Sequence, residues 1–160
     1  MKNKKKNSGT EGVDLAALDR RRARLEGCAS VGLLFVCAAL AIPFFNLTEI
    51  SSMVWCRWIY AAGALIYLIA RAFVGTDPRE SLRVRRLRRV EFWAGVAFCI
   101  GAGMWFYNFN RLGEIIITGG TLGIIRDTVM FTLVGAALQL IASWMIYFRK
   151  KRDMQSRVNE

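Results

Sequence analysis

A few polar residues lie inside otherwise apolar segments, and their chemistry is the first feature of interest in this sequence. Arg57 is the only charge well inside such a segment, Gln139 is near the middle of another, and Asn108 and Asn110 end a third. Polar side chains in apolar surroundings either pair with each other and hold helices together, or line a polar path. We favour an interhelical hydrogen bond for Gln139. For Arg57 we favour a long side chain that reaches the outer surface. Its candidate acidic partners are Glu49, Glu114 and Asp127.

Catalytic and metal-binding patterns are not found in the sequence. It has no His, so it offers no imidazole base and no His-based metal site. Its acids do not form a cluster with metal-ligand spacing, and no Ser or Cys has an obvious general base beside it. The cysteines lie in or beside apolar segments without CxxC spacing, so we interpret them as packing residues: Cys28, Cys37, Cys56 and Cys99. We predict no enzymatic activity, no cofactor and no metal.

Long uncharged stretches determine the fold class. Residues 27–48, 92–110 and 128–148 carry no charge, and residues 50–70 carry only Arg57. About 20 apolar residues suffice for a helix to cross the roughly 30 Å hydrocarbon core of a bilayer. We therefore predict an all-α membrane protein with four transmembrane helices, near residues 27–46, 52–72, 91–110 and 128–148. The first stretch is of full spanning length, so we expect no cleaved signal peptide.

The basic residues predict an orientation. Of 23 Lys and Arg residues, eight fall in residues 1–27, seven in residues 71–89 and five in residues 149–157. Loops rich in Lys and Arg stay on the cytoplasmic side of a membrane. We therefore expect both termini and the middle loop to be cytoplasmic, in a plasma (inner) membrane. The loops near residues 47–52 and 111–126 should lie outside.

These basic clusters also indicate the partners. The net charge of +11 is concentrated at segment ends, which points to a bilayer, including anionic lipids, and away from nucleic acid. Topological anchoring is our first interpretation, and headgroup binding is compatible with it. Glu26 and Glu91 lie among arginines, where we expect solvated ion pairs. The candidate headgroup contacts are Arg83, Arg85, Arg86, Arg88, Arg89, Lys150 and Lys151.

Aromatic residues are expected at both membrane interfaces, where Trp and Tyr are enriched. The sequence assigns one group to the outer interface and a smaller one to the inner interface. The outer group is Phe44, Phe45, Trp55, Trp58, Trp105 and Tyr107, and the inner group is Trp93, Trp144 and Tyr147.

The segments between and beyond the spans have distinct patterns. Residues 1–12 are polar, and we predict disorder there. Residues 75–90 should form a basic cytoplasmic helix that starts near Pro78, with Asp77 as its N-cap. Residues 149–160 form a basic tail. In the second outer loop, two apolar runs flank Gly119-Gly120, so either a β-hairpin or a helix that begins at Thr121 fits the pattern.

The two halves of the chain resemble each other. Arg24-Leu25-Glu26 precedes the first apolar segment, and Arg89-Val90-Glu91 precedes the third. Cys37 and Cys99 are each followed by six residues and then by two aromatic residues and an Asn. The sequence GALIYLIAR at 63–71 aligns with GAALQLIAS at 135–143, and the whole alignment needs one gap of three residues. We predict duplication of a helical hairpin, giving tandem hairpins over residues 13–74 and 91–148.

Small residues at helical spacing predict where helices touch. Helix association in lipid depends on close packing and interhelical hydrogen bonds, because lipid tails give no hydrophobic drive. Two stripes with a spacing of four residues should therefore face the interior of the bundle. They are Gly95, Cys99 and Gly103 in the third segment and Gly135, Gln139 and Ser143 in the fourth.

Two functions are compatible with these features. The first is a small non-enzymatic membrane protein that acts in assembly, scaffolding or regulation, through contacts with copies of itself or with another membrane protein. The alternative is an oligomeric channel or facilitator with a polar path near Arg57, Asn108, Asn110 and Gln139.

Overall fold

The computed structural model describes residues 7–45, 50–74 and 82–158, and all regular structure in these ranges is helical. Four helices follow one another: α1 (Asn7–Phe45), α2 (Ile50–Phe73), α3 (Leu82–Asn110) and α4 (Leu112–Val158). No strand occurs in the described part of the chain. The predicted all-α class is therefore confirmed.

Each helix contains a candidate membrane span, which is a segment that includes an 18-residue window of high hydropathy. These spans are Ala16–Pro43, Met53–Phe73, Val84–Asn110 and Ile125–Arg149. The shortest has 21 residues and is about 30 Å long at 1.5 Å per residue, which matches the hydrocarbon core. The prediction of four helices able to span a membrane is confirmed, and the chain is a multi-pass membrane protein by these criteria.

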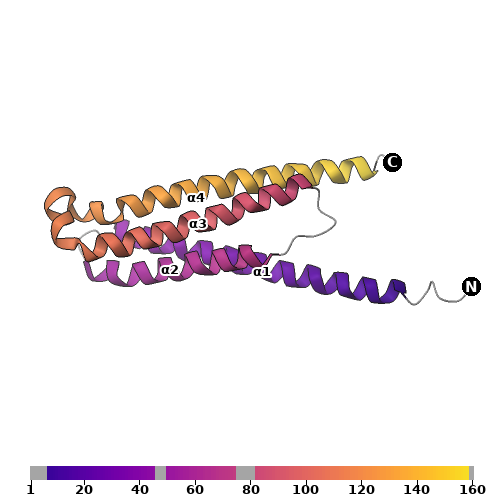
Figure 1. Cartoon of the computed structure of the whole chain (residues 1–160), viewed down its shortest axis with the longest axis horizontal. Helices are drawn as coiled ribbons and strands as arrows, with labels where there is room; N and C mark the ends of the chain where they lie inside the picture. Colours follow the sequence, from indigo (N-terminus) through magenta and orange to yellow (C-terminus); the bar gives the residue numbers. More distant parts are fainter. Residues whose placement is uncertain (1–6, 46–49, 75–81, 159–160) are drawn as a thin grey trace, which may run out of the picture.

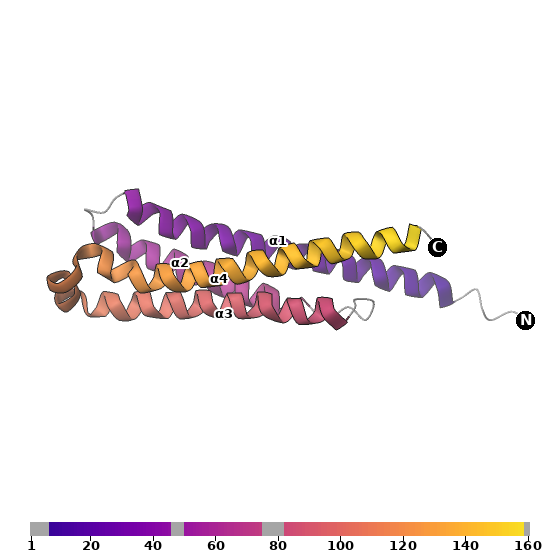
Figure 2. The ribbon, with the colours of Figure 1, turned by 90° about the horizontal axis from the view of Figure 1, so that it is seen from above.

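The four helices run side by side along the length of the molecule (Figure 1). The main packing contacts join α1 to α2, α3 to α4, and α2 to α3. Figures 1 and 2 show the N-terminus of α1 and the C-terminus of α4 at the same end of the bundle. The C-terminus of α2 and the N-terminus of α3 lie toward this end as well. The arginines of residues 20–24, 85–89 and 149–152 therefore gather there, and we call it the basic end.

Large aromatic side chains fill the core where α2 and α3 meet. Tyr60 and Trp105 have ring centroids 5.6 Å apart, and Tyr67 and Phe98 have ring centroids 5.3 Å apart. All four rings are buried, as is Val36 of α1 beside them. The expected place of Trp105 at the outer membrane interface is wrong, since its side chain is fully covered by the protein. The sequence places Trp105 near the end of its segment, but it does not show toward which side of the helix the Trp105 side chain points.

The segment that follows α3, predicted as the second outer loop, is the main correction to the predicted fold. Only Arg111 separates α3 from α4, and the backbone from Leu112 onward is helical. The β-hairpin around Gly119-Gly120 is therefore wrong, and the helix begins before Thr121. Figures 1 and 2 show the first turns of α4 as a bent segment at the end opposite the basic end. A helix satisfies its own backbone hydrogen bonds, which a lone hairpin near a membrane cannot do.

The helices also extend beyond the predicted spans at the basic end. α1 begins at Asn7, so residues 7–12 are helical where the sequence predicted disorder. The described part of α3 starts at Leu82, and the predicted cap at Asp77 and Pro78 lies outside the described residues. α4 continues through the basic tail to Val158.

Candidate functional site

A buried ion pair at the basic end is the strongest candidate for a functional site. Glu91 of α3 is only 4% exposed, and its Oε2 lies 3.0 Å from Nη1 of Arg71. Arg71 is in the last turn of α2, where the helix dipole favours a cation. The expectation of a solvated ion pair for Glu91 is therefore wrong. Three helices cover it, and the sequence could not show this.

Hydrogen bonds join this ion pair to α4. Ser143 donates from Oγ to Oε1 of Glu91 at 3.4 Å, and Gln139 donates from Nε2 to Oγ of Ser143 at 3.3 Å. Tyr67 donates its hydroxyl hydrogen to Oε1 of Gln139, and the Arg71 guanidinium lies 5.5 Å from the centroid of the Tyr67 ring. These five residues, which we call the Glu91 network, link α2, α3 and α4.

Helical spacing explains how so few residues build this network. Tyr67 and Arg71 are four residues apart on α2, and Gln139 and Ser143 are four apart on α4. Residues at this spacing lie on the same face of a helix. Gln139 and Ser143 belong to the predicted packing stripe. Tyr67 and Arg71 were missed, although their alignment with Gln139 and Ser143 in the repeat is a signal that was present.

A second polar layer lies farther from the basic end. The hydroxyl of Thr132 donates to the carbonyl oxygen of Thr128 at 2.7 Å, so Tyr60 is the donor in its 2.6 Å hydrogen bond with Thr132. Thr128 in turn donates to the carbonyl oxygen of Gly101 at 3.0 Å. This layer again ties α4 to α2 and α3.

The end opposite the basic end carries a third polar contact. Asn108, which is buried, donates from Nδ2 to Oδ2 of Asp127 at 3.1 Å. Asp127 also lies 3.5 Å from Nε of Arg126. Asn110 is exposed. Asn108 therefore joins α3 to α4, whereas Asn110 faces away from the bundle.

Arg57 lies among aromatic rings of α3. Its guanidinium carbon is 4.2 Å from the ring centroid of Phe109 and 5.1 Å from that of Phe106. Its Nε is buried without a hydrogen-bond partner in the described structure. Cation–π contacts of this kind stabilise a desolvated guanidinium. Arg57, Asn108 and Gln139 thus have different described partners, and Glu49 and the Glu114 side chain lie outside the described residues.

The predicted packing residues differ in their surroundings. A Cβ on Gly95 would lie 3.1 Å from side-chain carbons of Tyr67 and Leu68, so this glycine packs against α2. Cys99 is partly buried against the core, and Gly135 packs closely on Phe98 of α3. Gly103 is exposed and would have no atom within 4 Å of an added Cβ, so its expected inward position is wrong. Because 3.6 residues make a turn, a strict four-residue stripe drifts around the helix.

Sequence reasoning missed the closest helix contact. A Cβ on Gly63 would lie 2.7 Å from the carbonyl oxygen of Gly32, and one on Gly32 would lie 2.8 Å from the carbonyl oxygen of Gly63. α1 and α2 therefore touch backbone to backbone at this point. A Cβ on Gly101 would lie 2.8 Å from the Tyr60 hydroxyl. Gly32, Gly63 and Gly101 do not belong to the two predicted stripes.

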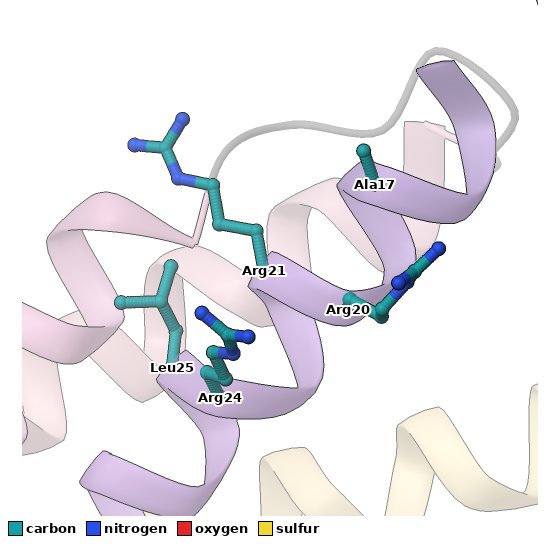
Figure 3. Close-up of a pocket in the computed structure, with 5 residues that line it drawn as sticks. All are labelled: Ala17, Arg20, Arg21, Arg24 and Leu25. Carbon is teal, nitrogen blue, oxygen red and sulfur yellow. The ribbon is translucent and has the colours of Figure 1, made fainter. Parts of the chain in front are cut away.

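The predicted headgroup contacts all lie at the basic end. Arg85 and Arg88 are half-buried, and Arg86, Arg89 and Lys151 are exposed. Arg88 also reaches α1, where its Nη2 lies 3.9 Å from Oε1 of Glu26. The side chains of Arg83 and Lys150 lie outside the described residues. Figure 3 shows a second basic surface on α1, a pocket of about 490 Å³ lined by Ala17, Arg20, Arg21, Arg24 and Leu25.

The described cysteines and acids form no metal site. Cys28 and Cys37 are exposed, Cys56 is buried, Cys99 is partly buried, and all four are free thiols. Among the described residues, no three Cys, Asp or Glu side chains come together. The chemistry available at the Glu91 network is therefore that of a carboxylate held against a guanidinium in a low-dielectric interior.

Comparisons of this chain with protein-family models, with curated proteins and with solved structures returned no match.

The hydrogen bond between Tyr67 and Gln139 gives a modest prediction. Replacing Tyr67 with Phe keeps the ring and removes the hydroxyl, so we expect the free energy of unfolding in lipid–detergent mixtures to fall by about 0.6 to 2 kcal/mol. Tyr107→Phe is the matched control, because Tyr107 is exposed and its hydroxyl accepts only from Arg111 of the next turn. An equal loss in both variants would contradict an interhelical role for the Tyr67 hydroxyl.

Proposed function

We propose that this chain is a non-enzymatic plasma-membrane protein that acts in assembly, scaffolding or regulation through the outward faces of its helices. The carrying observation is the low burial of α4. Only 11% of the apolar 18-residue window of α4 is buried within the chain, against 44% for the corresponding window of α3. Its outward face holds large apolar side chains that a second helix would cover well, namely Leu133, Leu140, Ile141 and Trp144.

The polar residues support an interaction role over a catalytic one. Polar side chains on α4 that point into the bundle, such as Gln139, Ser143 and Thr132, bond to α2, to α3 or to each other. They fix the bundle as a unit with a defined shape. A fixed bundle can present its outer faces to a partner without reorganising, which lowers the cost of association.

We further propose that the basic end is cytoplasmic. The arginines of α1, α3 and α4 gather at one end of the bundle, as the positive-inside rule requires of a single orientation. Both termini are then cytoplasmic, and the bent first turns of α4 lie on the outer side.

We also propose that the chain arose by duplication of a helical hairpin. Tyr60 bonds to Thr132 and Tyr67 bonds to Gln139, and the two partners are 72 residues apart in each pair. These pairs are equivalent positions in the alignment of residues 63–71 with 135–143 and its extension. Each of these bonds therefore joins residues at equivalent positions in the two halves.

The glycine contacts support the same duplication. An added Cβ on Gly63 would meet Gly32 and Val36, and one on Gly135 would meet Ala94 and Phe98. When Cys37 is aligned with Cys99, Gly32 stands opposite Ala94 and Val36 opposite Phe98. Close glycine contacts therefore occur at equivalent places in the two helix pairs. Among the described residues, the packing of α2 on α3 has no counterpart of similar extent between α4 and α1, so the duplicated hairpins do not form a symmetric bundle.

Self-association in membranes tests the proposed function. The full-length chain, labelled separately with donor and acceptor dyes and reconstituted in liposomes, should show energy transfer between copies, and crosslinking in native membranes should trap a homo-oligomer or a complex with one partner. Ala137→Trp adds bulk to the outward face of α4 and should reduce the association, whereas Leu65→Trp on the exposed face of α2 should not. The proposal would be contradicted if these measurements showed no self-association and no stable partner.

A facilitator is the second candidate function. The observation in its favour is the series of polar contacts on the inner face of α4, which runs from Asp127 through Thr128, Thr132 and Gln139 to Ser143. Ion flux through liposomes that contain the purified chain would support this function if Gln139→Leu or Arg57→Ala abolished it. If no flux of common ions were observed, the facilitator function would be rejected and the scaffold proposal would remain.

A further inference from the structure

A basic cavity lies where α2 ends beside the first turns of α3. Its volume is about 770 Å³, and five arginines contribute to its walls. Arg71 comes from α2, and Arg85, Arg86, Arg88 and Arg89 come from α3. This cavity is distinct from the pocket on α1 in Figure 3, and it opens beside the Glu91 network because both include Arg71.

The charge around this cavity is strongly positive. The described residues that line it include five arginines and no carboxylate. Next to it, Glu91 lies 3.0 Å from Arg71 and Glu26 lies 3.9 Å from Arg88. The Nε of Arg71 is buried and has no hydrogen-bond partner in the described structure.

Arginine clusters of this kind suit phosphate. The guanidinium group offers paired N–H donors that match two oxygens of a phosphate, and it stays charged at all physiological pH values. Several such groups around one cavity can contact the same phosphate from different sides. The phosphodiester of a phospholipid has two non-bridging oxygens, and each can accept hydrogen bonds from more than one guanidinium group.

The remaining walls indicate that the ligand comes from the membrane. Phe92 and Trp93 line the same cavity, and both side chains are partly exposed. Aromatic residues of this type lie at the level of lipid headgroups. Ala72 adds a further apolar surface on α2. An occupant with a phosphate and an attached acyl chain would contact both the arginines and these apolar groups.

We propose that this cavity binds the phosphate headgroup of one anionic phospholipid from the leaflet at the basic end. This inference rests on the proposed orientation in the plasma membrane, and it adds a defined lipid site between α2 and α3. Bound there, the phosphate lies beside the Glu91 network and holds the first turns of α3 against the end of α2.

Native mass spectrometry of the full-length protein in mild detergent tests this site. Titration with phosphatidylglycerol should give one tightly retained lipid, and phosphatidylcholine should not. Arg86→Gln combined with Arg89→Gln should weaken that binding by about tenfold or more, because each basic residue contributes about 1 kcal/mol to headgroup binding. Both arginines are exposed, so their replacement should leave the bundle folded.

The matched control is Arg20→Gln combined with Arg24→Gln, which removes the same charge from the pocket on α1. This control should keep the tightly bound lipid. Equal weakening in both double variants would overturn the proposal, because the attraction would then depend on total charge alone. Displacement of the lipid by an equal concentration of inorganic phosphate would also overturn it and would indicate a soluble anion. Self-association in liposomes is measured separately, so its failure would not be confused with failure at this site.

Discussion

Replacing Glu91 with Gln should lower the free energy of unfolding by about 3 to 5 kcal/mol, which is the usual cost of removing one partner of a buried ion pair. The loss arises because Arg71 stays buried beside a neutral amide, and because Ser143 and Gln139 lose their anchor in the network. Reversible unfolding in lipid–detergent mixtures measures this change.

Glu26→Gln is the control, because Glu26 is the equivalent residue in the first half of the repeat and its side chain is 48% exposed. Its ion pairs with Arg22 and Arg88 are on the surface, so we expect a change below about 1 kcal/mol. The double variant Arg71→Met with Glu91→Leu should recover most of the stability lost by Glu91→Gln, because no buried charge is left unpaired. Equal effects of the two single Glu→Gln changes would contradict the buried network.

Replacing Gly63 with Ala should separate α1 from α2. The new Cβ would lie 2.7 Å from the carbonyl oxygen of Gly32 and 2.8 Å from Cβ of Phe35, and a backbone atom cannot move aside without moving its helix. Overpacking of this kind costs about 1 to 3 kcal/mol. The same unfolding measurement applies, with the distance between spin labels on α1 and α2 as a second readout.

Other glycines of the chain provide a graded control series. Gly135→Ala should cost less than Gly63→Ala, because its two nearest contacts are ring atoms of Phe98 and its backbone contact, the Ala94 carbonyl oxygen, is at 3.1 Å, compared with 2.7 Å for the Gly32 carbonyl oxygen at Gly63. Gly103→Ala meets open space and should raise stability by up to about 1 kcal/mol through helix propensity. A Gly63→Ala protein as stable as the Gly103→Ala protein would show that α1 and α2 do not touch at Gly32.

The presence of four helices able to span a membrane could be predicted from the sequence, because the length and hydropathy of a segment do not depend on its neighbours in space. The predicted span at 52–72 corresponds to Met53–Phe73, and the third predicted span and α3 both end at residue 110. An uncharged run with basic residues beside it identifies such a segment, whichever helices pack against it in the bundle. The same pattern cannot tell which face of a helix turns inward.

The errors in the prediction come from that missing direction. Trp105 was placed at an interface by its depth, and Glu91 was placed in solvent by its arginine neighbours, but both side chains point into the bundle. At Gly119-Gly120, local propensity alone allowed both a turn and a helix, and the helix is found. The repeat contains further information about the network. It aligns Tyr67 with Gln139 and Arg71 with Ser143, and all four residues belong to the Glu91 network.

Chemical labelling of single cysteines in intact cells tests the central claim most directly, which is that the apolar stretches cross a bilayer with all basic ends on its cytoplasmic side. Asn110→Cys and Arg86→Cys, each made in a variant without Cys28, Cys37, Cys56 and Cys99, place one exposed thiol at each end of the bundle. A membrane-impermeant maleimide should label Asn110→Cys in intact cells and Arg86→Cys only after permeabilisation. Labelling of Arg86→Cys in intact cells, or a protein that stays soluble without detergent, would contradict the account.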